Sequence, residues 1–257
     1  MTVSEVWKYL DRVAPKRYAE NYDNVGLLIG DENADVTGVC CCLDITHSII
    51  KEAAEKGANL IVSHHPVIFD ALKSIPTWSP VAALVRQNIA AIAMHTNFDI
   101  AEGGVNDTLI ELLEWTIDGV LEVTQSDGKG FGAVCDIPLE FTPQMLAEYC
   151  KEKLDLGGVR YSRVNRSIKR IAVCCGGGVD RTVMQLARER GCDAIISGDI
   201  KHNFWIEAEN CGLTLIDAGH FGTEKAAAHK LAKLVTAEFS AVHVFSAECE
   251  CDPCGYV

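Results

Sequence analysis

The sequence predicts an α/β fold of two similar α/β lobes, each with a mostly parallel sheet covered by helices. Short apolar runs of strand length alternate with segments of helical periodicity along most of the chain. Polar residues, above all histidines, follow several of the predicted strands. Because ligands of open α/β sheets bind beyond the carboxyl ends of the strands, these residues predict a metal site at strand carboxyl ends between the lobes.

The predicted elements follow one another in a βαβ pattern, which favours parallel strands. Residues 23–31 predict a turn that feeds a short strand, and Asn88 predicts a turn between a helix and a strand. The predicted helices cover residues 3–10, 48–56, 80–87, 106–114, 143–154, 181–190, 203–210 and 224–239. The predicted strands cover residues 37–43, 58–63, 89–95, 168–174, 193–197, 213–217 and 242–246.

A turn-rich stretch at residues 119–131 interrupts this pattern and predicts a hairpin. We interpret it as a crossing between two domains. Residues 1–124 plus 218–257 then form the first lobe, which carries most of the metal site, and residues 125–217 form the second lobe.

The composition narrows the class of protein. The chain has 257 residues, of which 48% are hydrophobic, so it can bury a sizeable core. Its net charge of −13 argues against a duplex nucleic-acid partner, because an acidic surface repels phosphates. No apolar run is long enough to span a membrane, and the first residues do not resemble a secretory signal. We expect a cytoplasmic protein.

The chain contains twelve cysteines. Cys40, Cys41 and Cys42 lie together in an apolar run, which is typical of small buried hydrophobic residues in a reducing compartment. Among the cysteines, the tail spacing Cys249-x-Cys251-x-x-Cys254 is the one arrangement that resembles metal ligands, although no second Cys or His pair is near it. Residues 176–178 are glycines in a strand-to-helix turn, and they indicate either tight packing or an anion-binding backbone.

Five residues combine into a candidate metal site: His64, His65, Asp99, His220 and Glu224. Neighbouring residues of an extended chain point to opposite sides, so His64 and His65 can bind two adjacent ions. His220 and Glu224 are four residues apart at a helix start and therefore share a face. Five ligands are too many for one catalytic zinc, but they suit two divalent ions of zinc, iron, manganese or nickel. The alternative is that these groups cap helices and satisfy core hydrogen bonds.

Motifs along nearly the whole chain carry a family resemblance. They are Asn21-Tyr22-Asp23-Asn24-Val25-Gly26-Leu27, Leu43-Asp44, Ser63-His64-His65-Pro66, His95-Thr96-Asn97-Phe98-Asp99, Gly103-Gly104-Val105-Asn106-Asp107, Gly198-Asp199-Ile200-Lys201-His202, Asp217-Ala218-Gly219-His220-Phe221-Gly222-Thr223-Glu224 and the tail pair Asp252-Pro253. In this order they resemble the NIF-three-like family, whose bacterial members are labelled GTP cyclohydrolase I type 2 homologues or dinuclear metal-centre hexameric proteins. The chain resembles the short form of the family. One departure is Asn203, where many members carry a second histidine.

The resemblance implies that the five candidate residues bind two divalent metal ions per subunit and that six subunits form a homohexameric toroid. It also implies a small-molecule nucleotide substrate, in which hydroxide held by the ions attacks C8 of the guanine ring of GTP and formate is released. His95 precedes Asp99 by one turn of chain and would act as a general acid–base or as a partner of a metal ligand. The alternative is a non-catalytic protein with a metal-binding, metal-handling or regulatory role.

Overall fold

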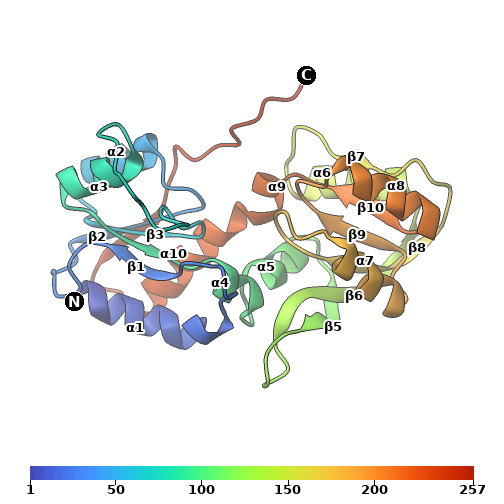
Figure 1. The fold of residues 1–257 in the computed structure, drawn as a ribbon, viewed down its shortest axis with the longest axis horizontal. Coiled ribbons are helices and arrows are strands. Elements are labelled where there is room, and N and C mark those ends of the chain that lie inside the picture. Colours follow the sequence, from blue (N-terminus) through green and yellow to red (C-terminus); the bar gives the residue numbers. More distant parts are fainter. The chain divides into compact units, whose positions relative to one another are not determined.

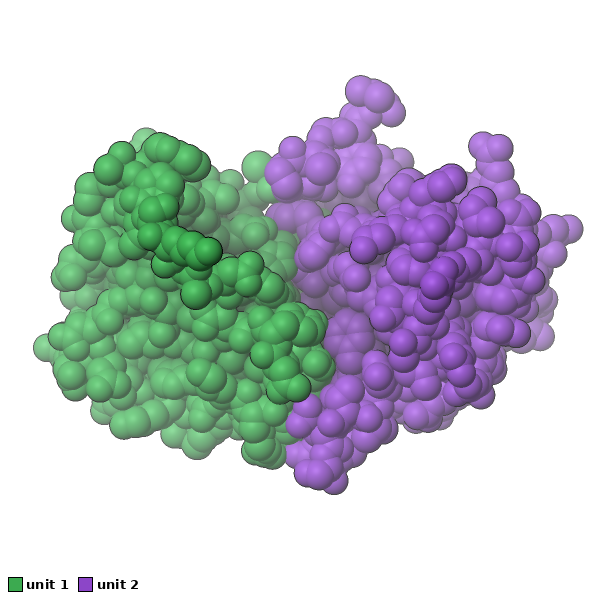
Figure 2. Space-filling model, in the orientation of Figure 1, with its two compact units in different colours: residues 1–104, 225–251 green, residues 105–224, 252–257 purple.

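The computed structural model describes residues 1–257, which form two compact units (Figure 2). Unit 1 consists of residues 1–104 and 225–251, and unit 2 consists of residues 105–224 and 252–257. The boundaries of these units differ from those of the predicted lobes. The division of the chain into those two lobes stays a prediction. No helix of the structure combines the length and apolar character that crossing a membrane requires.

Unit 1 contains a five-stranded sheet in the order β1-β4-β3-β2-β11. Its strands are β1 (Gly26–Ile29), β2 (Gly38–Cys42), β3 (Leu60–Ser63), β4 (Ala90–Ala93) and β11 (His243–Ser246). All neighbouring strands pair in parallel except β1, which pairs antiparallel with β4. The parallel strands end in register, since Cys42 pairs with Ser63 and Ser63 with Ala93. The loops after β2, β3 and β4 therefore leave the sheet at one edge.

Helices cover both faces of this sheet, with α2 and α3 on one side and α1 and α10 on the other (Figure 1). The helices are α1 (Val3–Val13), α2 (His47–Glu55), α3 (Pro80–Gln87), α4 (Thr96–Ile100) and α10 (Ala226–Glu238), with a 3₁₀ turn at Lys16–Tyr18. Their starts are set by local chemistry. Thr2 and Glu5 form a capping box at α1, and Thr46 and Ser79 accept backbone N–H bonds at α2 and α3.

The core of unit 1 lies around β2, whose five residues are all buried. Cys40 and Cys42 pack in one cluster with side chains of α2 and α3, including Ile49 and Leu84. The β2 strand is flanked by β3 and β11, and α10 packs against both β2 and β11. The apolar cysteine run is thus a central strand, as the sequence indicates.

Unit 2 contains a six-stranded mixed sheet in the order β5-β6-β8-β9-β10-β7. Its strands are β5 (Thr116–Val123), β6 (Gly130–Phe141), β7 (Arg160–Tyr161), β8 (Ile168–Val173), β9 (Ala194–Ser197) and β10 (Thr214–Asp217). Only the β8–β9 and β9–β10 pairs are parallel. The β5–β6 hairpin confirms the turn signal, and Gly128 takes a positive φ of 85° in its turn. The parallel pairing predicted for this sheet is therefore confined to its three-stranded centre.

The helices of unit 2 enclose a second core. They are α5 (Val105–Leu112), α6 (Pro143–Lys153), α7 (Arg181–Glu189), α8 (His202–Cys211) and α9 (His220–Glu224). One apolar cluster joins α7 and α8 to the sheet through residues such as Val183, Ala208 and Ile195. Asp180 caps the start of α7, and α8 ends at Gly212, which takes the left-handed conformation.

The elements agree with the sequence prediction for most of the chain, with local differences. The helix predicted at 224–239 is observed as α10 from Ala226 to Glu238, and Glu224 belongs to the short helix α9, with Lys225 between the two helices. The short helix α4, the two-residue strand β7 and the β6 segment beyond residue 131 have no counterpart among the predicted elements. Each depends on tertiary pairing more than on local pattern.

Candidate metal centre

Three histidines leave the carboxyl edge of the unit 1 sheet together. His64 and His65 follow β3, and His95 follows the neighbouring strand β4. Their ring centroids lie 5.0 Å apart for His64–His65, 5.3 Å for His64–His95 and 5.5 Å for His65–His95. One nitrogen from each ring lies within 4.8 Å of the others, close enough for shared metal binding. The parallel register of β3 and β4 brings these rings together.

Each of these imidazoles is oriented by a hydrogen bond from Nδ1 to an oxygen. His64 Nδ1 bonds the Met94 carbonyl at 2.7 Å, and His65 Nδ1 bonds Asp44 Oδ1 at 2.8 Å. His95 Nδ1 bonds Asp23 Oδ1, also at 2.8 Å. Carbonyl and carboxylate oxygens carry no proton at neutral pH, so Nδ1 must be the donor. In the neutral ring Nε2 then holds the lone pair that a metal requires.

Asp23 makes the most extensive of these contacts. Its side chain is fully buried, and it also accepts hydrogen bonds from the backbone N–H and the hydroxyl of Thr96. Burial raises the pKa of Asp23, but the bonds from His95 and Thr96 outweigh it and lower that pKa to about 2. Asp23 is therefore ionised at neutral pH and fixes the orientation of His95.

Asp99 extends the histidine group of unit 1. It lies on α4, where its N–H bonds the His95 carbonyl, so one helical turn separates the two residues. Its Oδ1 lies 3.5 Å from Nε2 of His64, and both side chains are buried. Unit 1 thus presents three imidazoles and a carboxylate at one sheet edge.

Unit 2 presents the other two predicted ligands on the single-turn helix α9. His220 Nε2 and Glu224 Oε2 are 3.0 Å apart, which confirms that the i,i+4 spacing places them on one face. His220 Nδ1 bonds Asp199 Oδ2 at 2.8 Å, the arrangement found at the histidines of unit 1. Asp199 has a φ of 49°, a conformation rare outside glycine and enriched in asparagine and aspartate.

Glycines allow the backbone to approach this pair closely. A Cβ on Gly176, which has a φ of 57°, would lie 2.2 Å from Glu224 Oε1 and 3.0 Å from His220 Nε2. A Cβ on Gly198 would lie 2.5 Å from the backbone nitrogen of His220. The loops after β8, β9 and β10 therefore meet around α9. For the glycine run at 176–178, this geometry favours tight packing around the ligand pair.

The structure thus brings His64, His65 and Asp99 together in unit 1, and His220 with Glu224 in unit 2. His95, predicted as the catalytic residue, lies among the histidines. Three aspartates that orient these histidines, Asp23, Asp44 and Asp199, are not among the residues predicted from the sequence. Their position in the family motifs was the available signal, but spacing alone assigns them no partner.

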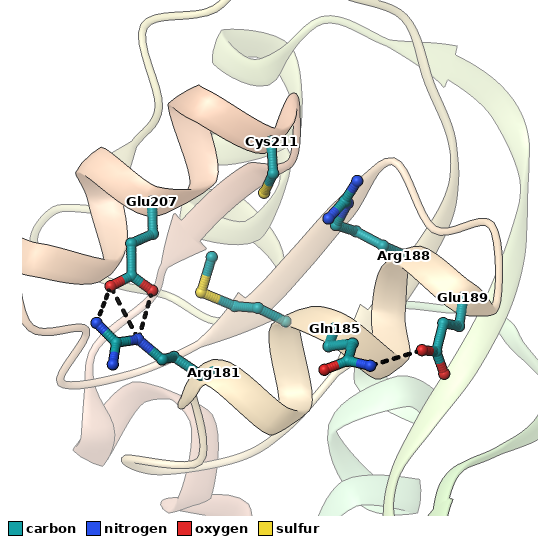
Figure 3. Close-up of a pocket in the computed structure, with 7 residues that line it drawn as sticks. Arg181, Gln185, Arg188, Glu189, Glu207 and Cys211 are labelled. Carbon is teal, nitrogen blue, oxygen red and sulfur yellow. Dashed lines mark hydrogen bonds and ion pairs between the residues drawn. The ribbon is translucent and has the colours of Figure 1, made fainter.

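Two other features contribute none of the predicted site residues. A surface groove of about 540 Å³ lies between α7 and α8, and Arg181 on its wall is bound by Glu207 (Figure 3). The tail cysteines Cys249, Cys251 and Cys254 are exposed. No cysteine belongs to any group of side chains close enough to hold a metal, so the ligand-like spacing of the tail has no structural counterpart.

The donor set fits divalent ions of the zinc, iron, manganese and nickel type. Imidazole nitrogens and carboxylate oxygens are the ligands that these ions accept, and each histidine already has an outer partner that fixes its tautomer. Fold and side chains together define a two-sheet α/β protein with a histidine- and carboxylate-rich candidate metal centre.

Comparison with known proteins gives the family. A sequence model described as DUF34/NIF3 (NGG1p interacting factor 3) matches residues 1–253. A GTP cyclohydrolase 1 type 2 homolog of Clostridium perfringens is 34% identical over 230 residues, covering 87% of each chain. One from Campylobacter jejuni is 35% identical over 241 residues, covering 91% of each chain. A hypothetical protein of Staphylococcus aureus has a similar crystal structure, with a TM-score of 0.91 and 29% identity, covering 100% of this chain and 99% of the other. The chain belongs to the DUF34/NIF3 family.

Proposed function

We propose that the protein is a hydrolase dependent on two divalent metal ions per subunit and acting on a guanine nucleotide in the manner of a GTP cyclohydrolase. The observation that carries the proposal is the shared orientation of four histidines, each with Nδ1 bonded to an oxygen acceptor. This arrangement is the outer support expected of metal ligands.

In this proposal His64, His65, Asp99, His220 and Glu224 hold the ions. The set offers three imidazoles and two carboxylates, which matches a dinuclear centre better than a single zinc with an open position. When bound, two divalent ions would lower the pKa of water and so supply a nucleophile at neutral pH. Burial of His64, Asp99 and Glu224 keeps water from competing for the ligand atoms.

His95 has the role of proton transfer. Its Nδ1 proton is held by the ionised Asp23, so Nε2 is the atom that accepts or donates a proton at the site. Because Asp23 is anchored twice by Thr96, it also keeps the His95 ring in one orientation. This pairing of an imidazole with a buried carboxylate is suited to a general acid–base.

The nucleotide substrate is proposed from the relatives. Proteins 34% and 35% identical to this chain are named GTP cyclohydrolase 1 type 2 homolog. The residues of the candidate centre support the proposal of hydrolytic chemistry but point to no particular ring, so the proposed substrate rests on the names of these relatives.

Turnover with defined metal content tests the proposal. Protein stripped by chelator and reloaded with zinc, manganese or iron is offered GTP, and formate and the ring-opened product are measured. We expect two ions per chain and formate release that depends on them. No more than one ion per chain would contradict the dinuclear centre. Two tightly bound ions without turnover on GTP or other nucleotides would favour the non-catalytic, metal-handling alternative.

Assembly and location complete the proposal. Following the family resemblance, we propose a homohexamer, which light scattering at micromolar concentration would detect as a mass about six times the 27.9 kDa chain. The buried cysteines support a reducing cytoplasm as the working compartment. A monomer at all concentrations would contradict the assembly.

A further inference from the structure

We propose that Glu250, in the C-terminal tail, is a positioning residue that holds His65 in its ligand orientation through Asp44. This inference rests on the proposed metal-binding function for its significance. The chain of contacts that carries it lies entirely within unit 1.

The first link joins the tail to the loop after β2. Glu250 Oε1 accepts the backbone N–H of Leu43 at 2.6 Å and that of Asp44 at 3.2 Å. These two residues follow directly on the last residue of β2. A side-chain oxygen that accepts two successive backbone N–H groups fixes the local direction of the chain.

The second link joins that loop to His65 in two ways. The carboxylate of Asp44 accepts a hydrogen bond from Nδ1 of His65 at 2.8 Å, and the Leu43 carbonyl accepts one from the His65 backbone N–H at 2.9 Å. The two residues that Glu250 holds are therefore the two that orient His65. Displacement of this loop would shift both the backbone and the ring of the histidine.

Asp44 needs the restraint that Glu250 provides because its own side chain is exposed. Its side chain is 55% exposed, while the His65 side chain is 21% exposed. A solvent-exposed aspartate on an unrestrained loop samples several rotamers and holds a neighbouring ring poorly. Fixing its backbone through Glu250 reduces this freedom, so Asp44 can keep His65 in one tautomer.

The tail reaches this position along an ordered path. The Ala247 N–H bonds the Cys41 carbonyl beyond the β2–β11 pairing, and the N–H groups of Glu248 and Cys249 bond Glu52 on α2. Glu250 is the next residue. Its contact with the loop is thus the end of a continuous series of backbone anchors and is not an isolated surface contact.

The geometry makes a sharp set of variants available. Both hydrogen bonds end on the same atom, Oε1, so Glu250→Gln can retain them, whereas Glu250→Ala removes them. Glu248→Ala is the matched control, because Glu248 lies two residues earlier, has an 82% exposed side chain and pairs only with Lys56. Asp44→Ala, alone and combined with Glu250→Ala, tests whether the effect passes through Asp44.

The experiment measures zinc affinity by competition with a chelator, together with the imidazole ¹⁵N signals of the metal-free proteins. We expect Glu250→Ala to weaken zinc binding by about 10–100-fold, the usual effect of losing a partner of a metal ligand. We also expect the His65 ring to lose its single tautomer while His64 keeps its own. Glu250→Gln and Glu248→Ala should resemble the wild type. In the Asp44→Ala background, Glu250→Ala should cause a smaller loss than in the wild type, because only the route through the Leu43 carbonyl remains.

The possible results separate this inference from the proposed function. Unchanged zinc affinity and an unchanged His65 tautomer in Glu250→Ala would overturn the inference while leaving the metal site intact. Additive losses in the double variant would overturn it as well, because the effect would not pass through Asp44. If wild-type protein bound no metal, the proposed function would fail, while the tautomer measurement would still decide whether Glu250 positions His65.

Discussion

Asp23, Asp44 and Asp199 act alike, since the carboxylate of each accepts a hydrogen bond from Nδ1 of a histidine. As a result the three rings share one tautomer when neutral, with the proton on Nδ1 and the lone pair on Nε2. The roles of individual residues can therefore be separated by removing a side chain and measuring the metal, independently of any substrate.

Glu224→Ala should damage the centre more than His95→Ala. From its spacing to His220 we predict that Glu224 would serve as a shared ligand of both ions, so its loss would remove a ligand from each. His95→Ala should keep the metal but slow any reaction by roughly 10²–10⁴-fold, the scale of general acid–base help. Elemental analysis of the two variants is the measurement.

The outcomes of this comparison are distinct. Metal lost only in Glu224→Ala supports the assignment. Equal loss in both variants would make His95 a direct ligand, a result that its position among the rings of His64 and His65 makes worth testing. Metal retained in both would contradict the bridging role of Glu224.

The twelve thiols should divide by exposure. None is joined in a disulfide, and Cys249, Cys251 and Cys254 are the exposed ones. Burial raises the pKa of Cys40, Cys135 and Cys150 to about 12, so these thiols are unreactive. A thiol reagent should therefore titrate three cysteines quickly in the native protein and close to twelve after anaerobic denaturation. A count of six or fewer after denaturation would indicate structural disulfides.

At the level of elements, the short helix α9 depends on the loop that passes over it. Gly176→Ala should weaken metal binding by at least about 10-fold, because the added Cβ would lie 2.2 Å from Glu224 Oε1. Gly191→Ala is the matched control. Gly191 has a similar positive φ of 73°, but no atom lies within 4 Å of the position of its Cβ. Both variants should lose about 1–2 kcal/mol of stability from backbone strain, and only Gly176→Ala should lose metal affinity.

Helix α2 anchors the tail through Glu52, and this contact predicts a pH dependence. Burial raises the pKa of Glu52, but hydrogen bonds from Cys249, Lys56 and the tail backbone lower it to about 2. A pKa lowered on folding stabilises the protein above the ordinary carboxyl pKa, and the contribution is lost as pH falls toward 2. At pH 6 the wild type should be more stable than Glu52→Gln by on the order of 1–2 kcal/mol, and this difference should shrink below about pH 4.5.

Chemical denaturation at a series of pH values measures this difference. Glu55→Gln provides the control, since Glu55 lies on the same helix in an exposed pair with Lys51. The Glu55 variant should follow the wild type throughout. A Glu52→Gln protein as stable as the wild type at pH 6 would show that the tail contact adds nothing.

Helices and strands were predicted well from the sequence where a local pattern of residues specifies them. The helix at Pro80–Gln87 has the predicted bounds, because Ser79, Pro80 and Asn88 specify its start and end. The strand β7 and the helix α4 were predicted poorly, since a two-residue strand and a single helical turn have no period. For the centre, spacing correctly paired His220 with Glu224. It could not connect Asp23 to His95, which lies 72 positions away, or Glu250 to Leu43, which lies 207 positions away.

At the scale of the whole molecule, the proposed ligands run from His64 to Glu224, so metal binding should stabilise the native state. Free metal at 100 times its dissociation constant would add about 2.7 kcal/mol. For a chain of this length, we expect chelator to lower the unfolding temperature by roughly 5–10 °C. Calorimetry with and without chelator, repeated on Glu224→Ala, tests this. The variant should respond much less, and an equal response would place the stabilising metal elsewhere.

Unit 1 is built from two pieces of chain, and the second piece is synthesised only after residues 105–224 of unit 2. Strand β2 lies between β3 and β11, but β11 begins at His243, roughly 200 residues after β2 ends. At about 5–20 residues per second, translation leaves one edge of β2 open for about 10–40 s. During that interval the nascent chain exposes unpaired backbone groups beside three adjacent thiols. Chaperones and a reducing environment would therefore matter more for the synthesis of this protein than for its finished state.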